Sequence, residues 1–176
     1  MERYVDFSNG DVVKIHKEKI LTMPQIAIAN KIKRRYRLCL HDSPDNSLQE
    51  MFICRTQGDY VPPDKHFGIP ESHTIIQGSE AIILFSDDGD IIDVFLLDRD
   101  RGYISYRINS DVYHMTVPIT DVAIDYEVKP GPFLPENNIY PDWAPKNEDN
   151  ETVQLFLNQI QSKINDYIDC LGLDLL

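Results

Sequence analysis

Residues 58–78 are the most informative stretch of the sequence, and they read GDYVPPDKHFGIPESHTIIQG. Asp64 and His66 are two residues apart, so in an extended chain their side chains point to the same face. Glu71 then opens a further extended stretch, and another histidine, His114, begins a later one. Two imidazoles and two carboxylates that converge inside a β-barrel would form an N/O site for a divalent first-row metal such as Fe, Mn, Ni or Zn.

Short β-rich segments lie on both sides of this stretch, separated by turn residues rather than by helices. In the Asp-Asp-Gly-Asp turn, Gly89 can take a positive φ between two strongly apolar segments, and further glycines fall at other breaks. The absence of helical crossovers excludes parallel βαβ units. The pattern therefore predicts an all-β sandwich or barrel, with strands over residues 35–40, 48–56, 73–77, 80–85, 91–97, 103–108, 113–117 and 122–128.

Helices are expected on both sides of the β-rich region. Thr22 and Pro24 have the character of a helix start, which predicts one short helix over residues 25–31. Residues 151–171 carry apolar side chains at three- and four-residue steps, so they predict an amphipathic helix that docks on the barrel.

These elements define the expected organisation of a single domain. An N-terminal helical lead covers residues 1–34, and a β-barrel with a proline-rich closing loop covers residues 35–146. A C-terminal helix packed on the barrel covers residues 147–176.

Composition excludes several classes of protein. The formal net charge is −12, and 42% of the residues are hydrophobic, so the chain is not a disordered acidic tail. The negative field argues against nucleic acid as a partner. The longest apolar runs, such as residues 81–85, are far shorter than the roughly 20 residues of a membrane span, which predicts no membrane insertion. The N-terminal residues lack a signal arrangement, and the three cysteines form no C-x-x-C pair, so we expect a cytoplasmic protein.

The residue spacing resembles the signature of the cupins, G-x5-H-x-H-x(3,4)-E-x6-G, followed by a later strand with another histidine. Four residues stand in register with this signature: Gly58, His66, Glu71 and Gly78. Asp64 occupies the position of the first histidine, and the second cupin motif, normally P-x-G-x-x-H, keeps only its histidine, His114. The resemblance implies a double-stranded β-helix, also called a cupin jelly roll.

A wider part of the sequence is similar to the WbuC-type cupin-fold metalloproteins. The segments that carry this similarity are RRYRLCLH at 34–41, Gln49 with Met51, residues 71–78, FSDDG at 85–89, EVKPGPF at 127–133 and WAP at 143–145. They span about residues 27–146. Members of this family are associated with bacterial O-antigen and other surface-polysaccharide gene clusters, and cupins frequently form homodimers.

Transferred position by position, the metal ligands implied by the family are Asp64, His66, Glu71 and His114. A carboxylate at position 64 would make a harder site, or it would mark a site that has lost its metal. His73 shares the inward face of Glu71 on an extended strand and could supply the missing imidazole. Alternatively, His73 is a core histidine hydrogen-bonded to a neighbouring side chain.

Four further residues are candidates for substrate binding. Arg35 and Arg37 lie on one face of an extended chain, and a guanidinium pairs well with phosphate or carboxylate. The alternative for these two is a solvated strand edge. Tyr126 and Trp143 could stack on a sugar or a base, or they could close one end of the barrel.

The resemblance implies a metal-dependent cupin that acts on a sugar or sugar nucleotide in surface-polysaccharide (lipopolysaccharide O-antigen) biosynthesis. A bound metal would serve as a Lewis acid on a carbonyl or hydroxyl group, while a carboxylate or His73 moves a proton. The alternative is a non-catalytic saccharide-binding or regulatory cupin with a degenerate metal site. An enzyme needs an open coordination position that faces a pocket, whereas a binding module does not.

Overall fold

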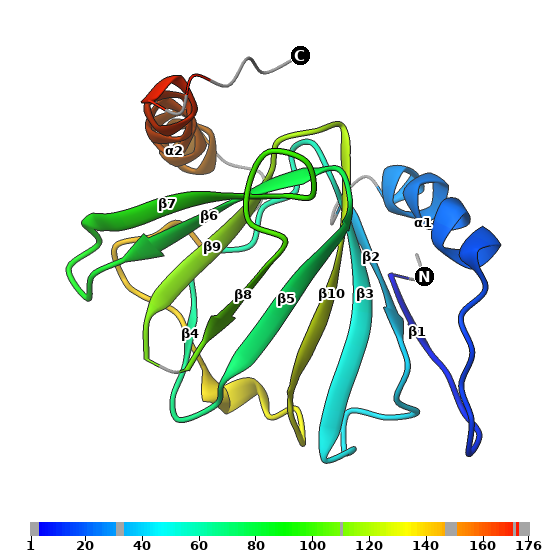
Figure 1. Cartoon of the computed structure of the whole chain (residues 1–176). Coiled ribbons are helices and arrows are strands. Elements are labelled where there is room, and N and C mark those ends of the chain that lie inside the picture. Colours follow the sequence, from blue (N-terminus) through cyan, green and yellow to red (C-terminus); the bar gives the residue numbers. More distant parts are fainter. Residues whose placement is uncertain (1–3, 31–33, 110, 147–150, 171, 173–176) are drawn as a thin grey trace.

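The computed structural model describes residues 4–30, 34–109, 111–146, 151–170 and 172. Two β-sheets make up most of the structure, and one helix lies outside each of them (Figure 1). The elements in chain order are β1 (Val5–Phe7), α1 (Lys17–Ala29), β2 (Arg35–Cys39), β3 (Leu48–Thr56), β4 (Lys65–His66), β5 (Glu71–Gln77), β6 (Ser79–Phe85), β7 (Ile91–Asp98), β8 (Ser105–Ile108), β9 (Tyr113–Pro118), β10 (Val122–Pro130), the 3-10 helix η1 (Pro135–Asn137), β11 (Asn138–Ile139) and α2 (Glu151–Cys170).

The larger sheet has six strands in the order β1-β2-β3-β10-β5-β8, and the smaller sheet has three in the order β7-β6-β9. The pairs are antiparallel except for β1 with β2, which run parallel. β11 and β4 form an additional two-stranded sheet. The all-β jelly roll that the sequence predicts is therefore confirmed, and its eight predicted strands appear as β2, β3 and β5 to β10.

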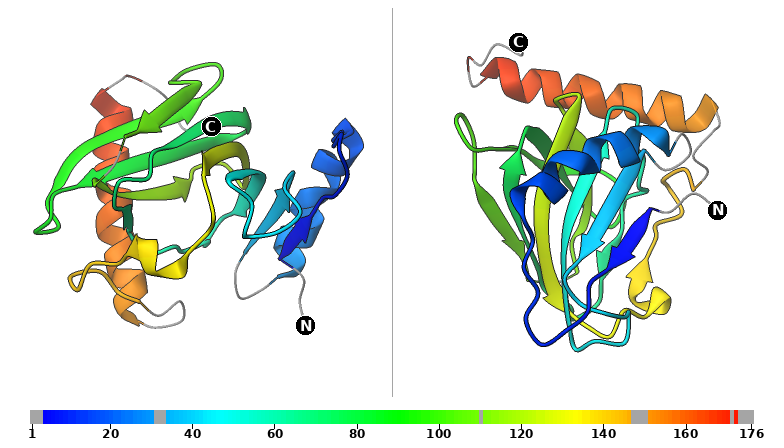
Figure 2. Two further views of the ribbon diagram at one scale, coloured as in Figure 1. Left: turned by 90° about the horizontal axis from the view of Figure 1, so that it is seen from below. Right: turned by 90° about the vertical axis from the view of Figure 1, so that its right-hand side faces the viewer.

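The two helices cover the outer faces of the sheets (Figures 1 and 2). Met23 and Ala27 of α1 are fully buried against Tyr36, Leu38 and Cys54 of the large sheet. α2 covers the small sheet, and its inward side chains pack on alternate residues of β6 and β9. The α2 residues of this cluster are Val153, Ile160, Ile164 and Ile168. The main apolar clusters under the helices therefore lie outside the barrel wall.

The N-terminal helix is longer than the sequence predicts. α1 begins at Lys17, and the ring of His16 accepts a hydrogen bond from the Glu18 backbone N–H over 3.4 Å. Pro24, which the sequence pattern marks as a start signal, lies inside the helix. The loss of one backbone donor at Pro24 is tolerated because the buried Met23 and Ala27 hold the helix on the sheet. The C-terminal helix is predicted over residues 151–171, and residue 171 lies outside the described residues.

The chain passes from the large sheet to the small one at Gly78, the single residue between β5 and β6. Gly78 has a φ of +71°, and a Cβ there would come within 2.2 Å of the Val122 carbonyl oxygen and 2.5 Å of Thr120 Oγ1. A side chain cannot be accommodated at this corner.

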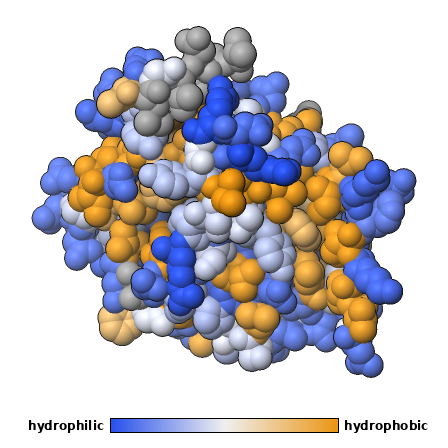
Figure 3. All heavy atoms as spheres, viewed as in Figure 1, coloured by the Kyte–Doolittle hydropathy of each residue, from blue (hydrophilic) through white to orange (hydrophobic). Residues whose placement is uncertain are grey.

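Apolar residues on the face shown in Figure 3 are interspersed with hydrophilic ones rather than gathered in one patch. Neither α1 nor α2 is long and apolar enough to cross a membrane.

Candidate metal centre

The alternation of strand side chains directs a polar set into the barrel. β5 turns Glu71 and His73 inward, and β9 contributes His114. Asp64 precedes β4, which carries His66, and the Asp64 backbone exchanges hydrogen bonds with that of His114 over 3.2 and 3.0 Å. Residues far apart in the sequence are therefore fixed beside each other by backbone pairing.

Glu71 lies at the centre of this set. Its Oε1 is 2.6 Å from His114 Nε2 and 3.5 Å from His73 Nε2, and its Oε2 is 3.2 Å from His66 Nε2. Asp64 Oδ2 is 3.8 Å from His66 Nε2 and accepts a hydrogen bond from Asn138 Nδ2 over 3.2 Å. One ligand atom from each of Asp64, His66 and His114 lies within 4.8 Å of the others. Three imidazole nitrogens and two carboxylates thus converge.

The far nitrogens of two rings are held by acceptors. His114 Nδ1 donates to the Val112 carbonyl oxygen over 3.0 Å, and His73 Nδ1 lies 2.7 Å from Asp125 Oδ2. Carbonyl and carboxylate oxygens accept, so each ring carries its proton on Nδ1 and, when neutral, presents the Nε2 lone pair to Glu71. This is how metal-binding histidines are usually oriented.

The contact between His114 Nε2 and Glu71 Oε1 requires a proton. If both groups are deprotonated, two lone pairs face each other at 2.6 Å, which is repulsive, and this separation is too short for a metal ion with bonds of about 2.0–2.2 Å to lie between the two atoms. The donor set of imidazoles and carboxylates suits a divalent first-row metal. The residues present therefore fit a metal ion.

The electrostatics of the site follow from burial and close pairing. Burial alone would lower the pKa of His73, but Asp125 and Glu71 raise it to about 10. Burial also opposes protonation of His114, yet the adjacent Glu71 carboxylate raises the pKa of that ring. For Glu71, burial favours the neutral form, but the three imidazoles hold its pKa well below the ordinary value. Burial raises the pKa of Asp64. Without a metal, protons occupy the cluster, and a metal ion has to displace them.

Behind His73 lies a second tier of buried charges. Arg55 pairs with Asp125 through a short contact, and its Nη1 is 3.1 Å from Glu80 Oε1. Its Nε is also 3.9 Å from Asp59, which pairs with Arg35 over 2.8 Å. Burial, followed by the charge of Asp125, raises the pKa of Glu80 to about 8. Arg55 thereby holds Asp125 in place, and Asp125 is the carboxylate that orients His73.

The site opens on a cavity of about 830 Å³ inside the barrel. Lys129 lines it, with its Nζ 2.8 Å from Glu127 Oε1 and 3.9 Å from Glu71 Oε2. Partly exposed aromatic side chains also contribute to the lining: Tyr4, Phe7, Phe133 and Tyr140. The cavity is therefore charged at the metal centre and aromatic where it meets solvent.

The substrate-binding candidates are separated in space. Arg35 and Arg37 both line the cavity. Tyr126 lies against Phe52, with ring centroids 4.9 Å apart, and donates to Glu50 Oε1 over 2.7 Å. Neither Tyr126 nor Trp143 lines the cavity, so these two side chains are not placed to contact a ligand bound there.

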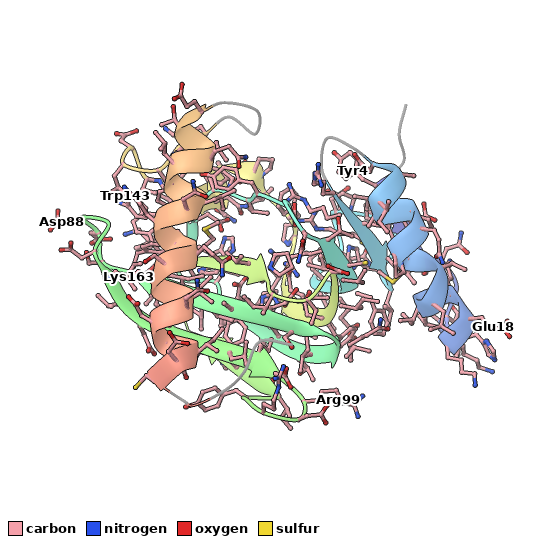
Figure 4. All side chains as sticks on the ribbon, turned by 90° about the horizontal axis from the view of Figure 1, so that it is seen from above. Tyr4, Glu18, Asp88, Arg99, Trp143 and Lys163 are labelled. Atoms are coloured by element: carbon pink, nitrogen blue, oxygen red, sulfur yellow. The ribbon has the colours of Figure 1, made fainter. Side chains whose placement is uncertain are left out.

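Trp143 belongs to the packing under α2. Its ring centroid lies 5.1 Å from that of Phe85 and 6.4 Å from that of Phe156, and Figure 4 shows the residue beside the first half of α2. Its Nε1 donates to the Asp87 carbonyl oxygen over 3.0 Å. Trp143 therefore packs on the outer face of the small sheet, under α2, and does not close an end of the barrel.

The sequence interpretation missed Asp125, Arg55, Glu80 and Lys129. A signal was present in β10, where Asp125, Glu127 and Lys129 alternate with other residues and so share the inward face. Three charges in a row on one face of a central strand indicate a polar interior.

Comparisons with known proteins agree with the fold. A family model described as a domain of unknown function, DUF6016, matches residues 15–97. No curated protein matches the chain. Two facing antiparallel sheets, with the motif residues on strands that line their interior, are the arrangement that the motif spacing implied. The fold is a cupin jelly roll.

Three solved structures illustrate this similarity. CapF, in a complex with the inhibitor 3-isopropenyl-tropolone, is 14% identical with a TM-score of 0.50, and the match covers 61% of this chain and 31% of CapF. Protein SO0799 from Shewanella oneidensis is 9% identical with a TM-score of 0.47, over 55% of this chain and 63% of that protein. The cupin domain of Cnp3 from Schizosaccharomyces pombe is 13% identical with a TM-score of 0.44, over 55% of this chain and 64% of that domain. This chain covers less than two thirds of each of these structures.

Proposed function

We propose that this chain is a divalent-metal-binding cupin that acts on a small sugar or sugar nucleotide in surface-polysaccharide biosynthesis. The observation that carries the proposal is the convergence of three imidazole Nε2 atoms on Glu71 at the wall of an 830 Å³ cavity. The cavity has room for a substrate of monosaccharide size or larger. The WbuC-type resemblance of the sequence supports the choice of substrate class and pathway.

The metal would be held by His66, Glu71 and His114, together with Asp64 or His73. His73 is suited to this role because Asp125 holds its Nδ1 and turns its Nε2 toward Glu71. Fe, Mn, Ni and Zn all accept such ligands.

When bound, the metal would supply Lewis-acid polarisation of a substrate oxygen. The chain's own groups bind and orient the substrate around it. Lys129 Nζ, 3.9 Å from Glu71 Oε2, presents donors to the same region of the cavity. If Asp64 is the fourth ligand, the Nε2 of His73 is left to exchange a proton with a substrate hydroxyl.

One observation favours a second candidate, a non-catalytic saccharide-binding or regulatory cupin. Asp64 replaces the first histidine of the cupin motif, and protonated His73 and His114 can neutralise Glu71 without a metal. In that case the cavity would bind its ligand through the paired charges alone.

The test is metal content by mass spectrometry of untagged protein purified without chelators. We expect a near-stoichiometric first-row metal in the wild type, and its loss in His66→Ala and His114→Ala because each removes a ligand. Retention in Asp64→Ala with loss in His73→Ala would make His73 the fourth ligand. His16→Ser serves as the matched control, since it removes an exposed histidine and keeps a helix-capping side chain.

The opposite result is equally informative. If the wild type holds no metal after reconstitution with Fe(II), Mn(II), Ni(II) and Zn(II), the metal-dependent function is wrong and the binding module is favoured.

We also propose, from the sequence resemblance and motif arguments alone, that the protein is cytoplasmic and a homodimer. Light scattering of the purified protein tests the second point, since the monomer mass would contradict it.

A further inference from the structure

The cations of the cavity wall differ in their pairing. Four of them line the cavity: Arg35, Arg37, Arg55 and Lys129. Arg35 is 2.8 Å from Asp59, Arg55 pairs with Asp125 and Glu80, and Lys129 is 2.8 Å from Glu127. Arg37, among the described residues, has no ion pair and no side-chain hydrogen bond.

Arg37 is placed by regular strand geometry. It lies on β2, where the inward positions are Arg35, Arg37 and Cys39, and the outward residues Tyr36 and Leu38 pack under α1. Its backbone N–H donates to the Tyr4 carbonyl oxygen over 2.8 Å. β1 thus anchors the backbone at this point, while the side chain is partly withdrawn from solvent in the cavity.

A half-buried guanidinium without an anion is unusual in this protein. The chain carries a net charge of −12, so acidic partners are abundant, and its other cavity cations have found them. Partial burial weakens the hydration of a cation, and a planar fork of donors binds a carboxylate or phosphate in a bidentate manner. The arrangement leaves this pairing available to a ligand.

Arg37 and the metal centre lie at different places on the wall of one cavity. β2 and β5 are separated by β3 and β10 in the sheet, which is three strand spacings, or about 14 Å across the sheet. The strand register places Arg37 level with Ile75 of β5, so Glu71 also lies four residues further along that strand. A ligand with its anionic group on Arg37 and its oxygen atoms at the metal centre would therefore extend along the cavity.

The neighbours of Arg37 suit a sugar-like ligand. Phe7 of β1 lines the same part of the cavity and packs edge-on against His41, with ring centroids 5.6 Å apart. An aromatic ring close to a cation without an anionic partner in the described part of the chain suits a polar ligand that carries an anionic group.

We infer that Arg37 forms an anion subsite for a phosphate or carboxylate group of a ligand whose oxygen atoms reach the metal centre. This inference rests on the proposed function and narrows its substrate class to anionic sugars.

The experiment compares three matched probes by isothermal titration of metal-loaded protein: glucose 1-phosphate, glucuronate and glucose. We expect at least one anionic probe to bind more tightly than glucose, and the better of the two identifies phosphate or carboxylate. Arg37→Gln should weaken that probe about tenfold or more, because it removes a charge-assisted bidentate contact. It should leave the affinity for glucose and the metal content unchanged.

Arg99→Gln is the matched control, since Arg99 is an exposed arginine in the turn after β7, at the periphery of the molecule (Figure 4). Arg37→Lys keeps the charge and loses the fork, so it should fall between the wild type and Arg37→Gln. If Arg37→Gln does not fold, Arg37→Lys provides the same comparison, and a lysine variant that binds the anionic probe as tightly as the wild type overturns the inference.

Two further outcomes also overturn it: neither anionic probe binds better than glucose, or Arg37→Gln binds the anionic probe as the wild type does. Either result with a normal metal content contradicts the subsite and leaves the proposed metal centre intact. Absence of metal contradicts the proposed function instead.

Discussion

Ile83 and Glu80 lie three residues apart on β6 and face opposite environments. Ile83 is fully buried in the apolar cluster under α2. Glu80 is almost as deeply buried on the inner face of the same strand, where its Oε1 lies 3.1 Å from Arg55 Nη1. The same contrast holds in the large sheet, where Leu38 packs under α1 and Arg37 lines the cavity. The two helices therefore provide much of the apolar burial, and the interior is left free to hold charges.

This division separates stability from chemistry. A substitution outside the barrel wall should change the free energy of unfolding and leave metal binding intact. A substitution inside should change metal binding as well. Three predictions test whether the division holds.

The largest effect is expected for Asp125→Asn. It leaves Arg55 and His73 without their shared buried carboxylate, which should cost about 3–5 kcal/mol of unfolding free energy. If His73 is a metal ligand, metal affinity should also fall by about 10–100-fold, because the ring loses the group that orients it. Urea denaturation in the presence of chelator measures the change in unfolding free energy, and metal titration measures the change in metal affinity. Unchanged values in both would mean that the buried tier has no role in holding the site.

Ile164→Ala should cost about 2–5 kcal/mol, since it opens a cavity between α2 and the small sheet. Metal content per folded molecule should stay at the wild-type level. Leu155→Ala, at an exposed position of the same helix, is the control and should change stability little. Loss of metal in Ile164→Ala would contradict the separation of the two regions.

The smallest effect is expected for Glu80→Gln, which tests how a buried carboxyl group inside the barrel contributes to the pH dependence of stability. The pKa of Glu80 is raised to about 8, from an ordinary value near 4.5, so the folded protein keeps this proton over a range where the unfolded chain loses it. Its contribution to stability is fully present below about pH 4.5 and is lost as the pH rises toward 8.

Glu80→Gln should therefore be nearly neutral at acidic pH and should reduce the decline of stability over this range. Urea denaturation at several pH values, with chelator present, measures both curves. Identical pH dependence in the variant and the wild type would show that Glu80 titrates normally.

The long strands could be predicted because each offers enough positions to reveal a period of two. β1, β4 and β11 have only two or three residues each, so no period is visible, and the sequence does not predict them as separate strands. The sequence pattern predicts that the first helix begins at residue 25, just after Pro24, because proline usually marks a first turn. The burial of Met23 and Ala27 against the large sheet outweighs that local signal.

For the candidate site, the spacing of two residues places Asp64 and His66 on one face, and the family resemblance adds Glu71 and His114. The role of Asp125 could not be predicted in this way, because its contact with His73 joins β10 to β5, and residues 52 positions apart carry no local signal of their pairing. The alternation of Asp125, Glu127 and Lys129 places Tyr126 on the outer face of β10, whereas Trp143 lies outside the strands and has no such signal. The two arginine candidates have this signal, and both of them line the cavity.

Gly78 has a consequence for motion. A hinge needs a residue that is free to change φ and ψ, and Gly78 is instead enclosed by Val122 and Thr120 with no neighbouring loop to absorb a rotation. The corner at the C-terminal end of β5, the strand that begins at Glu71, is therefore stiff, and the two sheets cannot swing apart there. Any adjustment of the cavity to ligands of different size therefore falls to segments away from this corner, such as β1 at the edge of the large sheet.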